Sequence, residues 1–368
     1  MSVAEFQFHT ATRFVFGANT IDQLGALARE LGGQRVLVAS DQGVIDAGHT
    51  ARGIASLESA GLSVCCFSEV HENPSTLDVA RGVQLAKQFQ PDLLVGLGGG
   101  SSMDCAKGIN FIFTNGGEMK QYWGVGKASS DMLPMIAVPT TAGTGSEAQS
   151  FALISDAETH VIMACGDKKA ACRIAILDPM LTVTQPPRVT ALTGFDAIAH
   201  ALETLVTAKR SPFSQMLSRE AFRLLAQNFA QVLDEPEDLE ARGAMQWGAC
   251  LAGLAIENSM LGAAHGMANP LTAHYGIVHG QAVALTLPHV IRYNAATCEQ
   301  DYQAVLEQAS LAIHGDQAGL PPSVADEGSL GLAGFVSQLA AQAGLATRLS
   351  QCGVEAERLP QLAAEASQ

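Results

Sequence analysis

The first half of the chain alternates apolar runs of strand length with stretches of helical spacing, and no other feature constrains its fold as strongly. The apolar runs lie at 35–40, 63–67, 92–96 and 134–138. The helical stretches lie at 20–31, 43–60, 75–89 and 102–114. Strands that alternate with helices build a parallel sheet with crossover helices. The sequence therefore predicts an α/β domain, to which a strand-rich patch at 152–177 also belongs.

The second half of the chain has a different texture. After Pro186 and Pro187 the chain is rich in alanine and leucine and has few β-branched runs, which predicts successive helices. A chain of 368 residues is long enough for two domains, each with its own core. We therefore predict an α/β domain over 1–185 and an all-α domain over 186–368, with a surface loop at 315–329.

Charge and cysteine content limit the partners and the compartment of the protein. The net charge of −15 repels nucleic acid and anionic lipid, so we expect neither nucleic-acid binding nor membrane binding. Residues 1–17 lack the basic and apolar segments of a signal peptide, and no apolar run approaches membrane-spanning length. The eight cysteines form no C-x-x-C pair, which predicts reduced thiols and a cytoplasmic location.

A glycine loop follows the apolar run at 92–96. Three glycines at 98–100 precede a helix start, at which Ser101 and Asp104 have the spacing of a capping box. Glycines let a diphosphate approach the backbone, and a helix N-terminus offers it free N–H groups. Counted from Gly96, the loop does not match the motif G-x-G-x-x-G, because Ser101 occupies the position of the last glycine. It therefore predicts a phosphate site of another kind, or only a tight turn.

Two other strand ends carry polar groups that suit a dinucleotide. The segment 138–147 follows a strand and carries four hydroxyl side chains, which suit phosphate and ribose; the alternative is a polar connection before a hairpin. Asp41 ends the strand at 35–40, where a carboxylate can accept hydrogen bonds from ribose hydroxyls and repels a 2′-phosphate. Asp41 therefore favours NAD over NADP, unless it is only an exposed turn residue.

Side chains that can bind a metal occur in the second half. Asp196 and His200 are four residues apart and so share one face of a helix, although such a pair alone is often a coincidence of a helix surface. His265, His274 and His279 lie within fifteen residues, in an apolar and glycine-rich setting where imidazoles need partners. One carboxylate and three imidazoles suit Fe²⁺ or Zn²⁺ and are poor ligands for Mg²⁺ or Ca²⁺. The sequence therefore predicts a transition-metal site.

In this combination the motifs resemble the iron-containing, group III alcohol dehydrogenase family over nearly the whole chain. The matching segments are 98–104, 139–147, 194–203, and 265–271 with 278–280. The resemblance implies a Rossmann-like, dehydroquinate-synthase-like nucleotide-binding domain, a helical domain, and a catalytic divalent metal between them. It implies that the metal ligands are Asp196, His200, His265 and His279. It implies that the dinucleotide is held by Asp41, Asn73, Gly99, Gly100, Ser101, Asp104, Thr140, Thr141 and Thr144.

Two positions depart from the pattern of that family. Four residues after His265 the family usually carries a histidine assigned to proton relay, and this chain has Asn269. An amide cannot shuttle protons near neutral pH, so we predict that His274, or water, takes over the relay near Asn269. A lysine common in the hairpin after 139–147 has no counterpart here, and Ile162 is nearest to it in alignment.

These features predict a metal-dependent oxidoreductase that transfers a hydride between NAD(H) and a small primary alcohol or aldehyde. The resemblance also implies a homodimer or a higher homo-oligomer. One alternative is a glycerol dehydrogenase, maleylacetate reductase or dehydroquinate synthase of the same superfamily, although a dicarboxylate substrate would need arginines that the motifs lack. Another alternative, motivated by Asn269, is a catalytically impaired homologue that binds the dinucleotide without turnover.

Overall fold

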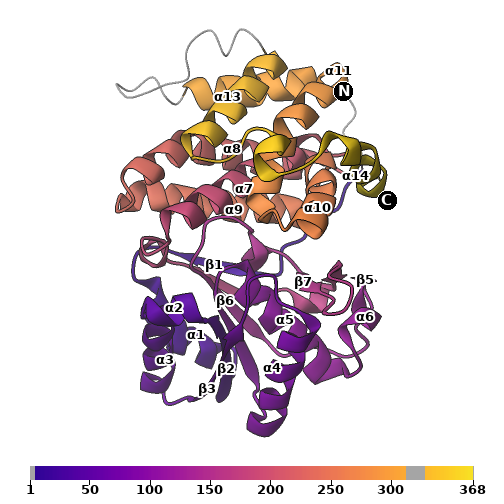
Figure 1. Ribbon diagram of the computed structural model, residues 1–368. Coiled ribbons are helices and arrows are strands. Elements are labelled where there is room, and N and C mark those ends of the chain that lie inside the picture. Colours follow the sequence, from indigo (N-terminus) through magenta and orange to yellow (C-terminus); the bar gives the residue numbers. More distant parts are fainter. Residues whose placement is uncertain (1–4, 312–327, 368) are drawn as a thin grey trace. The chain divides into compact units, whose positions relative to one another are not determined.

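The computed structural model describes residues 5–311 and 328–367 as two compact units (Figure 1). The α/β unit comprises Thr10–Thr141 and Gly145–Gln185. The helical unit comprises Ala142–Thr144, the described part of Met1–His9 and the described part of Pro186–Gln368. The predicted fold class, a parallel α/β part followed by a helical part, is confirmed.

The structure does not confirm two other predictions, the domain boundaries and the surface loop at 315–329. That 1–185 and 186–368 are independent domains stays a prediction. The two compact units divide at Gln185 and Pro186, but Ala142–Thr144 and the described part of Met1–His9 group with the helical unit. The predicted surface loop at 315–329 lies outside the described residues, except for its last two positions. Those positions, Gly328 and Ser329, begin a helix.

Six strands form one sheet in the α/β unit, in the order β1-β9-β6-β4-β2-β3, and all neighbours are parallel. They are β1 (Arg13–Phe16), β2 (Arg35–Asp41), β3 (Ser63–Val70), β4 (Leu93–Gly98), β6 (Met135–Pro139) and β9 (Ile174–Leu177). The strand after β2 pairs on one side of it, whereas the strands after β4 in this sheet lie on the other side. The loops after β2 and β4 therefore diverge, and ligands of open parallel sheets bind in the crevice at such a point.

A small second sheet belongs to the same unit. It contains β5 (Gly124–Val125), β8 (Ile162–Gly166) and β7 (Phe151–Ser155), in that order. β7 and β8 form an antiparallel hairpin, as the strand-rich patch predicts, and β5 pairs with β8 in parallel.

Helices cover both faces of the six-stranded sheet, with α1 and α3 on one face and α4 and α5 on the other (Figure 1). The helices of the unit are η1 (Thr20–Gln23), α1 (Leu24–Glu30), α2 (Gln42–Asp46), α3 (His49–Ser59), α4 (Thr76–Phe89), α5 (Gly100–Asn115), α6 (Met119–Tyr122), η2 (Ser146–Ala148), η3 (Lys168–Ala170) and η4 (Pro179–Thr182). In β2, Val38 joins the apolar cluster that includes Leu57 of α3, whereas Leu37 joins the one that includes Ile109 of α5. Both faces are thus buried, which explains the unbroken apolar runs.

The helical unit is built around α7. Its helices are α7 (Pro187–Val206), α8 (Pro212–Asp234), α9 (Leu239–Ser259), α10 (Ala263–Tyr275), α11 (His279–Leu311), α13 (Gly328–Gln342), η5 (Leu349–Cys352), η6 (Ala356–Arg358) and α14 (Leu359–Ala366). Helix α7 contacts α8, α9 and α11. Pro187 starts it, at the position where the missing N–H group of proline is harmless.

Among the described residues, α7 is the one helix that has the length and the apolar composition to cross a membrane. Of its most apolar 18-residue stretch, 83% is buried inside the protein. A core helix that is apolar all round accounts for this burial. The few polar side chains on α7 therefore lie in an apolar interior, where they need partners.

Candidate metal and dinucleotide sites

Helix α7 places two carboxylates and one imidazole on one buried face. Asp196, His200 and Glu203 are separated by four and then three residues, so they follow one another along the same side of the helix. Their side chains are 7%, 6% and 2% exposed, respectively. Groups this polar are stable in an interior only when they are bound to other polar groups or to an ion.

Two further imidazoles reach this face from the next helices. His265 is the third residue of α10, and His279 is the first residue of α11. Helix α11 can begin close to α7 because Gly280 has no side chain: a Cβ there would lie 2.3 Å from the carbonyl oxygen of Leu192. This close approach brings His279 to the side of α7 that carries Asp196.

Three of the four predicted metal ligands converge on one oxygen atom of the fourth, Asp196. Oδ1 of Asp196 lies 3.4 Å from Nε2 of His265 and 3.6 Å from Nε2 of both His200 and His279. The rings of His200 and His265 are stacked, with 4.7 Å between their centroids. Oδ1 of Asp196 and Nε2 of His265 are both buried, and neither has a hydrogen-bond partner among the described residues.

This arrangement fits a divalent transition metal. Ligand atoms about 2.1 Å from a tetrahedral ion lie roughly 3.4 Å from one another, and the distances around Oδ1 of Asp196 match this spacing. Among the described residues, Asp196, His265 and His279 form a group whose ligand atoms all lie within 4.8 Å of one another, and His200 joins it through its contact with Asp196. A cation among them supplies the partner that two buried ligand atoms lack. One oxygen and three nitrogen ligands suit both Fe²⁺ and Zn²⁺.

Burial and mutual charge set the protonation of the cluster in the absence of a cation. Burial alone would raise the pKa of Asp196, but the imidazoles, His200 foremost, hold this pKa well below its usual range. Burial lowers the pKa of His200 to about 4. Burial alone would also lower the pKa of His265, but Glu203 and Asp196 together raise it to about 10. At neutral pH and without a cation, His265 is therefore a charged imidazolium, with Nδ1 facing Glu203 and Nε2 facing Asp196.

Metal binding is therefore expected to release about one proton per chain near neutral pH. His265 is protonated below its pKa of about 10, and Nε2 must give up its proton to become a ligand. The apparent affinity for Zn²⁺ should accordingly rise by about tenfold per pH unit between roughly pH 7 and 8. Calorimetric titration in two buffers with different ionisation enthalpies measures the released proton, and a binding heat that does not depend on the buffer would contradict this expectation.

The two predicted proton-relay residues lie further along α10. His274 is nine residues after His265, which is about 13 Å along a helix. Its Nε2 atom lies 2.6 Å from Oε2 of Glu365 in α14, so this imidazole has a carboxylate partner at the helix end. Asn269 is one helical turn after His265 and is exposed. The structure does not bring His274 to the four ligands, so a relay through His274 stays a prediction that its position does not favour.

Asp41 lies at the end of β2 and is held by two hydrogen bonds. Its Oδ1 atom accepts one from the backbone N–H of Val44 at 3.1 Å and thereby caps α2. Its Oδ2 atom accepts one from Oγ of Ser102 at 3.0 Å, from the first turn of α5. The carboxylate therefore bridges the loops after β2 and β4, where the topology of the sheet opens a crevice.

The glycine loop after β4 begins α5 at Gly99, and not at Ser101 as the capping-box spacing predicts. Gly99 occupies the capping position and no side chain caps the helix, so that prediction is wrong. The N–H groups of a first helical turn have no partners within the helix and can bind an anion. Gly98 has a φ of +151°, and a Cβ there would lie 2.4 Å from Oγ of Ser102. Only glycine fits at this position.

Contacts of the backbone hold the other predicted dinucleotide residues around this loop. The N–H group of Asn73 donates to Oγ of Ser101 at 3.3 Å, and the N–H group of Thr140 donates to the carbonyl of Gly98 at 2.9 Å. A Cβ on Gly99 would lie 3.4 Å from Cγ2 of Thr141. The residues that the structure brings together are Asp41, Asn73, Gly99, Gly100, Ser101, Thr140 and Thr141.

Asp104 and Thr144 are placed differently from this group. The carboxylate of Asp104 is buried, and it accepts hydrogen bonds from Oγ of Ser146 at 2.6 Å and from the backbone N–H of Leu153 at 3.3 Å. Asp104 therefore fastens the hydroxyl-rich loop, and its contact with a dinucleotide stays a prediction. Thr144 belongs to the helical unit, and its contact with a dinucleotide stays a prediction.

The motifs did not reveal three residues that hold these sites, namely Ser102, Lys107 and Glu203. Lys107 is fully buried, and its Nζ atom donates to the carbonyl oxygens of Ser146 at 2.7 Å and Phe151 at 2.8 Å. Its sequence signal is a lysine inside an apolar helix, three residues after an aspartate. Glu203 has a comparable signal, because it follows His200 by three residues on the same predicted helix.

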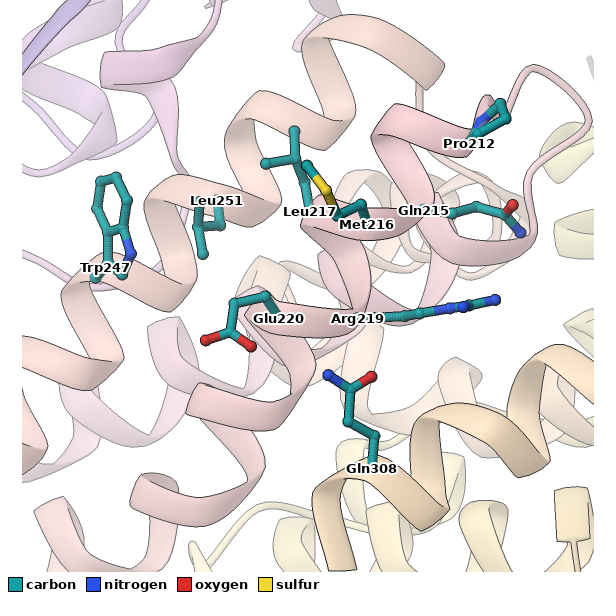
Figure 2. A pocket seen from close by; sticks show the side chains of 9 residues that line it. All are labelled: Pro212, Gln215, Met216, Leu217, Arg219, Glu220, Trp247, Leu251 and Gln308. Carbon is teal, nitrogen blue, oxygen red and sulfur yellow. The ribbon is translucent and has the colours of Figure 1, made fainter. Parts of the chain in front are cut away.

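The helical unit also has a surface pocket of about 600 Å³ (Figure 2). Six of its lining residues come from α8, two from α9 and one from α11: Pro212, Gln215, Met216, Leu217, Arg219, Glu220, Trp247, Leu251 and Gln308. None of them is a predicted site residue. The pocket therefore shares no lining residue with the predicted sites.

Comparison with known proteins relates both units to one family. Residues 11–179 match the family described as iron-containing alcohol dehydrogenase, and residues 190–368 match the family described as Fe-containing alcohol dehydrogenase, C-terminal. The 1,3-propanediol dehydrogenase of Klebsiella pneumoniae is 32% identical over 365 residues, which cover 99% of this chain and 92% of that protein. The NAD-dependent methanol dehydrogenase of Bacillus methanolicus is 32% identical over 293 residues, which cover 80% of this chain and 77% of the other.

The fold resembles that of solved structures of alcohol dehydrogenases and related enzymes. A crystal structure of a 1,3-propanediol oxidoreductase superposes on this chain with a TM-score of 0.92 at 31% sequence identity. The match covers 99% of this chain and 93% of the other.

Proposed function

We propose that this chain, which belongs to the iron-containing alcohol dehydrogenase family and is an oxidoreductase acting on alcohols, transfers a hydride between NAD(H) and a small primary alcohol or aldehyde. The site of reaction is a divalent metal, Fe²⁺ or Zn²⁺, held by the four converging side chains. One observation carries this proposal: three imidazole nitrogens lie between 3.4 and 3.6 Å from one buried oxygen of Asp196. A purely structural cluster has no reason to leave buried ligand atoms unpartnered.

The four ligands define what the chain contributes to the reaction. When bound, a divalent metal supplies Lewis acidity, which lowers the pKa of an alcohol hydroxyl. Asp196 places a negative charge at the centre of the cluster, and burial keeps His200 neutral, so that its lone pair can bind a cation. The side chain of His279 is 36% exposed, whereas the other three are less than a tenth exposed. In this proposal the substrate therefore arrives from the side of His279.

The proton of the alcohol passes to water in this proposal. The amide of Asn269 cannot accept a proton near neutral pH, and His274 is engaged by Glu365. The proton on Nδ1 of His265 is held by Glu203. The exposed side of His279 adjoins solvent. Water at this side is therefore the proposed acceptor of the alcohol proton.

The dinucleotide is proposed to bind in the crevice after β2 and β4. The first-turn N–H groups of Gly100 and Ser101 suit a diphosphate, and the carboxylate of Asp41 suits ribose hydroxyls. NAD fits better than NADP because a 2′-phosphate would meet the charge of Asp41. The relative from Bacillus methanolicus is named NAD-dependent, which supports the same choice.

Replacing Asp41 by asparagine is expected to shift the preference from NAD toward NADP by at least about tenfold. Asparagine can still cap α2, but it removes the charge that repels the 2′-phosphate, and a close charge pair of this kind is worth about 1.4 kcal/mol or more. The measurement is kcat/KM with each dinucleotide. Asp46→Asn, on the exposed side of the same helix, is the matched control and should leave the ratio unchanged. An unchanged ratio in Asp41→Asn would contradict the role of this carboxylate.

Turnover with a panel of short alcohols and aldehydes tests the proposed function. The full chain is reconstituted with Fe²⁺ or Zn²⁺, and the absorbance of the reduced nicotinamide is followed in both directions. We expect metal-dependent turnover with at least one primary alcohol or aldehyde. The relatives named for 1,3-propanediol and methanol make these two alcohols the first to try.

Two alternatives remain distinguishable in the same assay. An enzyme of the glycerol dehydrogenase or maleylacetate reductase kind would turn over a polyol or a dicarboxylate in preference to a simple alcohol. A catalytically impaired homologue, which Asn269 motivates, would bind the dinucleotide and show no turnover with any metal. The homo-oligomer and the cytoplasmic location stay predictions of the sequence.

A further inference from the structure

Glu203 makes three hydrogen bonds at the start of α10. Its Oε2 atom lies 2.5 Å from Nδ1 of His265. Its Oε1 atom accepts a hydrogen bond from the backbone N–H of Ala264 at 2.5 Å, and its Oε2 atom accepts one from the N–H of Gly262 at 3.3 Å. The carboxylate is 2% exposed, so one buried side chain of α7 serves both the N-terminus of α10 and an imidazole on it.

The direction of the bond between Glu203 and His265 follows from the chemistry of the two groups. An ionised carboxylate only accepts hydrogen bonds, so Nδ1 of His265 must carry the hydrogen. A neutral imidazole with its hydrogen on Nδ1 has its lone pair on Nε2. That atom is the one that lies 3.4 Å from Oδ1 of Asp196. Glu203 therefore selects the tautomer of His265 that can bind a metal.

The imidazole of His200 is not held in this way. Nδ1 of His200 is buried and has no hydrogen-bond partner among the described residues. Nδ1 of His265, in contrast, is hydrogen-bonded to Oε2 of Glu203 at 2.5 Å. His265 is also the ligand nearest to Oδ1 of Asp196. Glu203 is thus paired with the imidazole that lies closest to Oδ1 of Asp196.

We propose that Glu203 is a positioning residue, which orients His265 and fixes its tautomer for metal binding. The proposal rests on the metal site of the proposed function and adds a residue that does not touch the metal. Helix α7 then supplies two ligands directly and controls a third through Glu203. Partners of this kind commonly account for about 10- to 100-fold of metal affinity.

The test is Glu203→Gln, titrated with Co²⁺ alone in the full chain. When the glutamine oxygen takes the place of Oε1, it still accepts from the backbone N–H of Ala264, and its NH₂ group takes the place of Oε2 and donates to Nδ1 of His265. The hydrogen of His265 then moves to Nε2, and the lone pair toward Asp196 is lost. We expect Co²⁺ affinity to fall by about 10- to 100-fold, with an altered visible spectrum of the bound ion. Glu203→Asp keeps an acceptor but retracts it, so its affinity should lie between those of the wild type and Glu203→Gln.

A second capping residue separates orientation from helix capping. Asp238 caps α9 by accepting hydrogen bonds from the N–H groups of Glu240 and Ala241, as Glu203 does for α10 without the imidazole. Asp238→Asn should lower Tm and leave Co²⁺ affinity unchanged. If Glu203→Gln loses Tm in the same way but binds Co²⁺ within about threefold of the wild type, Glu203 is only a cap and the proposal is overturned.

The outcome for the wild type separates this proposal from the proposed function. If the wild type binds no Co²⁺, the metal site itself is wrong, and the role of Glu203 is overturned with it. If the wild type binds and Glu203→Gln binds equally well, only the role of Glu203 is wrong. Should Glu203→Gln fail to fold, Glu203→Asp carries the test, and an affinity equal to that of the wild type overturns the proposal.

Discussion

Replacing His265 by alanine is expected to abolish metal binding and to lower kcat/KM by about 10³-fold, while dinucleotide affinity stays unchanged. A divalent metal contributes several kcal/mol to the stabilisation of developing charge, and each 1.4 kcal/mol is a factor of ten in rate. The variant removes the nitrogen closest to Oδ1 of Asp196 and leaves Glu203 buried without its partner. The measurements are elemental analysis, kcat/KM with the best alcohol, and titration with reduced dinucleotide.

His274→Ala is the matched control on the same helix. His274 is paired with Glu365 near the end of α10, so its loss should leave metal content and turnover within about threefold of the wild type. A large loss of turnover with full metal content would instead support the relay that the sequence predicts for His274. Metal-dependent turnover that survives in His265→Ala would show that His265 is not a ligand.

Gly98→Ala is expected to weaken dinucleotide binding by about 100-fold and to leave metal affinity unchanged. The φ of Gly98 is +151°, and a Cβ there would lie 2.4 Å from Oγ of Ser102 and 3.0 Å from Oδ2 of Asp41. The substitution therefore breaks the bond between Ser102 and Asp41 and strains the loop. Strain and a lost charged hydrogen bond together cost about 3 kcal/mol, which corresponds to roughly 100-fold in affinity.

Gly61→Ala separates backbone strain from the loss of this contact. Gly61 has a φ of +77°, but a Cβ there would have no neighbour within 4 Å. The control should lower Tm without affecting dinucleotide affinity, whereas Gly98→Ala should affect both. Equal dinucleotide affinities in Gly98→Ala and the wild type would place the binding site elsewhere.

Much of the α/β unit follows from the sequence, because both faces of its sheet are buried. Buried strands read as continuous apolar runs, and such runs predict β2, β3, β4 and β6 at their observed positions. Short elements give no such signal: β5 has two residues, and its pairing with β8 is a tertiary contact. The predicted helix at 43–60 is divided into α2 and α3 at Gly48, whose φ of +80° favours glycine and interrupts the helix.

The metal cluster could be predicted only in part from spacing. The interval of four residues between Asp196 and His200 places both on one face of a helix, whatever the rest of the fold. The approach of His265 and His279 depends on how α10 and α11 pack against α7, which spacing does not determine. The histidine-rich stretch offered His265, His274 and His279 as candidates, and the resemblance to a family selected His265 and His279. The structure then brought both to the same oxygen.

Residues that act through others were the hardest to predict. Asp104 matches a family position for the dinucleotide, yet its carboxylate binds Ser146 and Leu153. Glu203 stands in a recognisable motif, but its role depends on the direction of a side chain toward His265. Sequence spacing fixes the face of a helix on which a side chain lies, and it does not fix the partner that the side chain meets there.

We propose that four side chains, Asp196, His200, His265 and His279, hold one catalytic divalent ion. The most direct test of this proposal measures bound metal and turnover in the same samples, after the full chain has been stripped with a chelator and titrated with Fe²⁺ or Zn²⁺. We expect turnover to be absent in the stripped protein, to rise in proportion to bound metal and to saturate at one ion per chain. Full turnover in stripped protein that contains no metal would contradict the proposal.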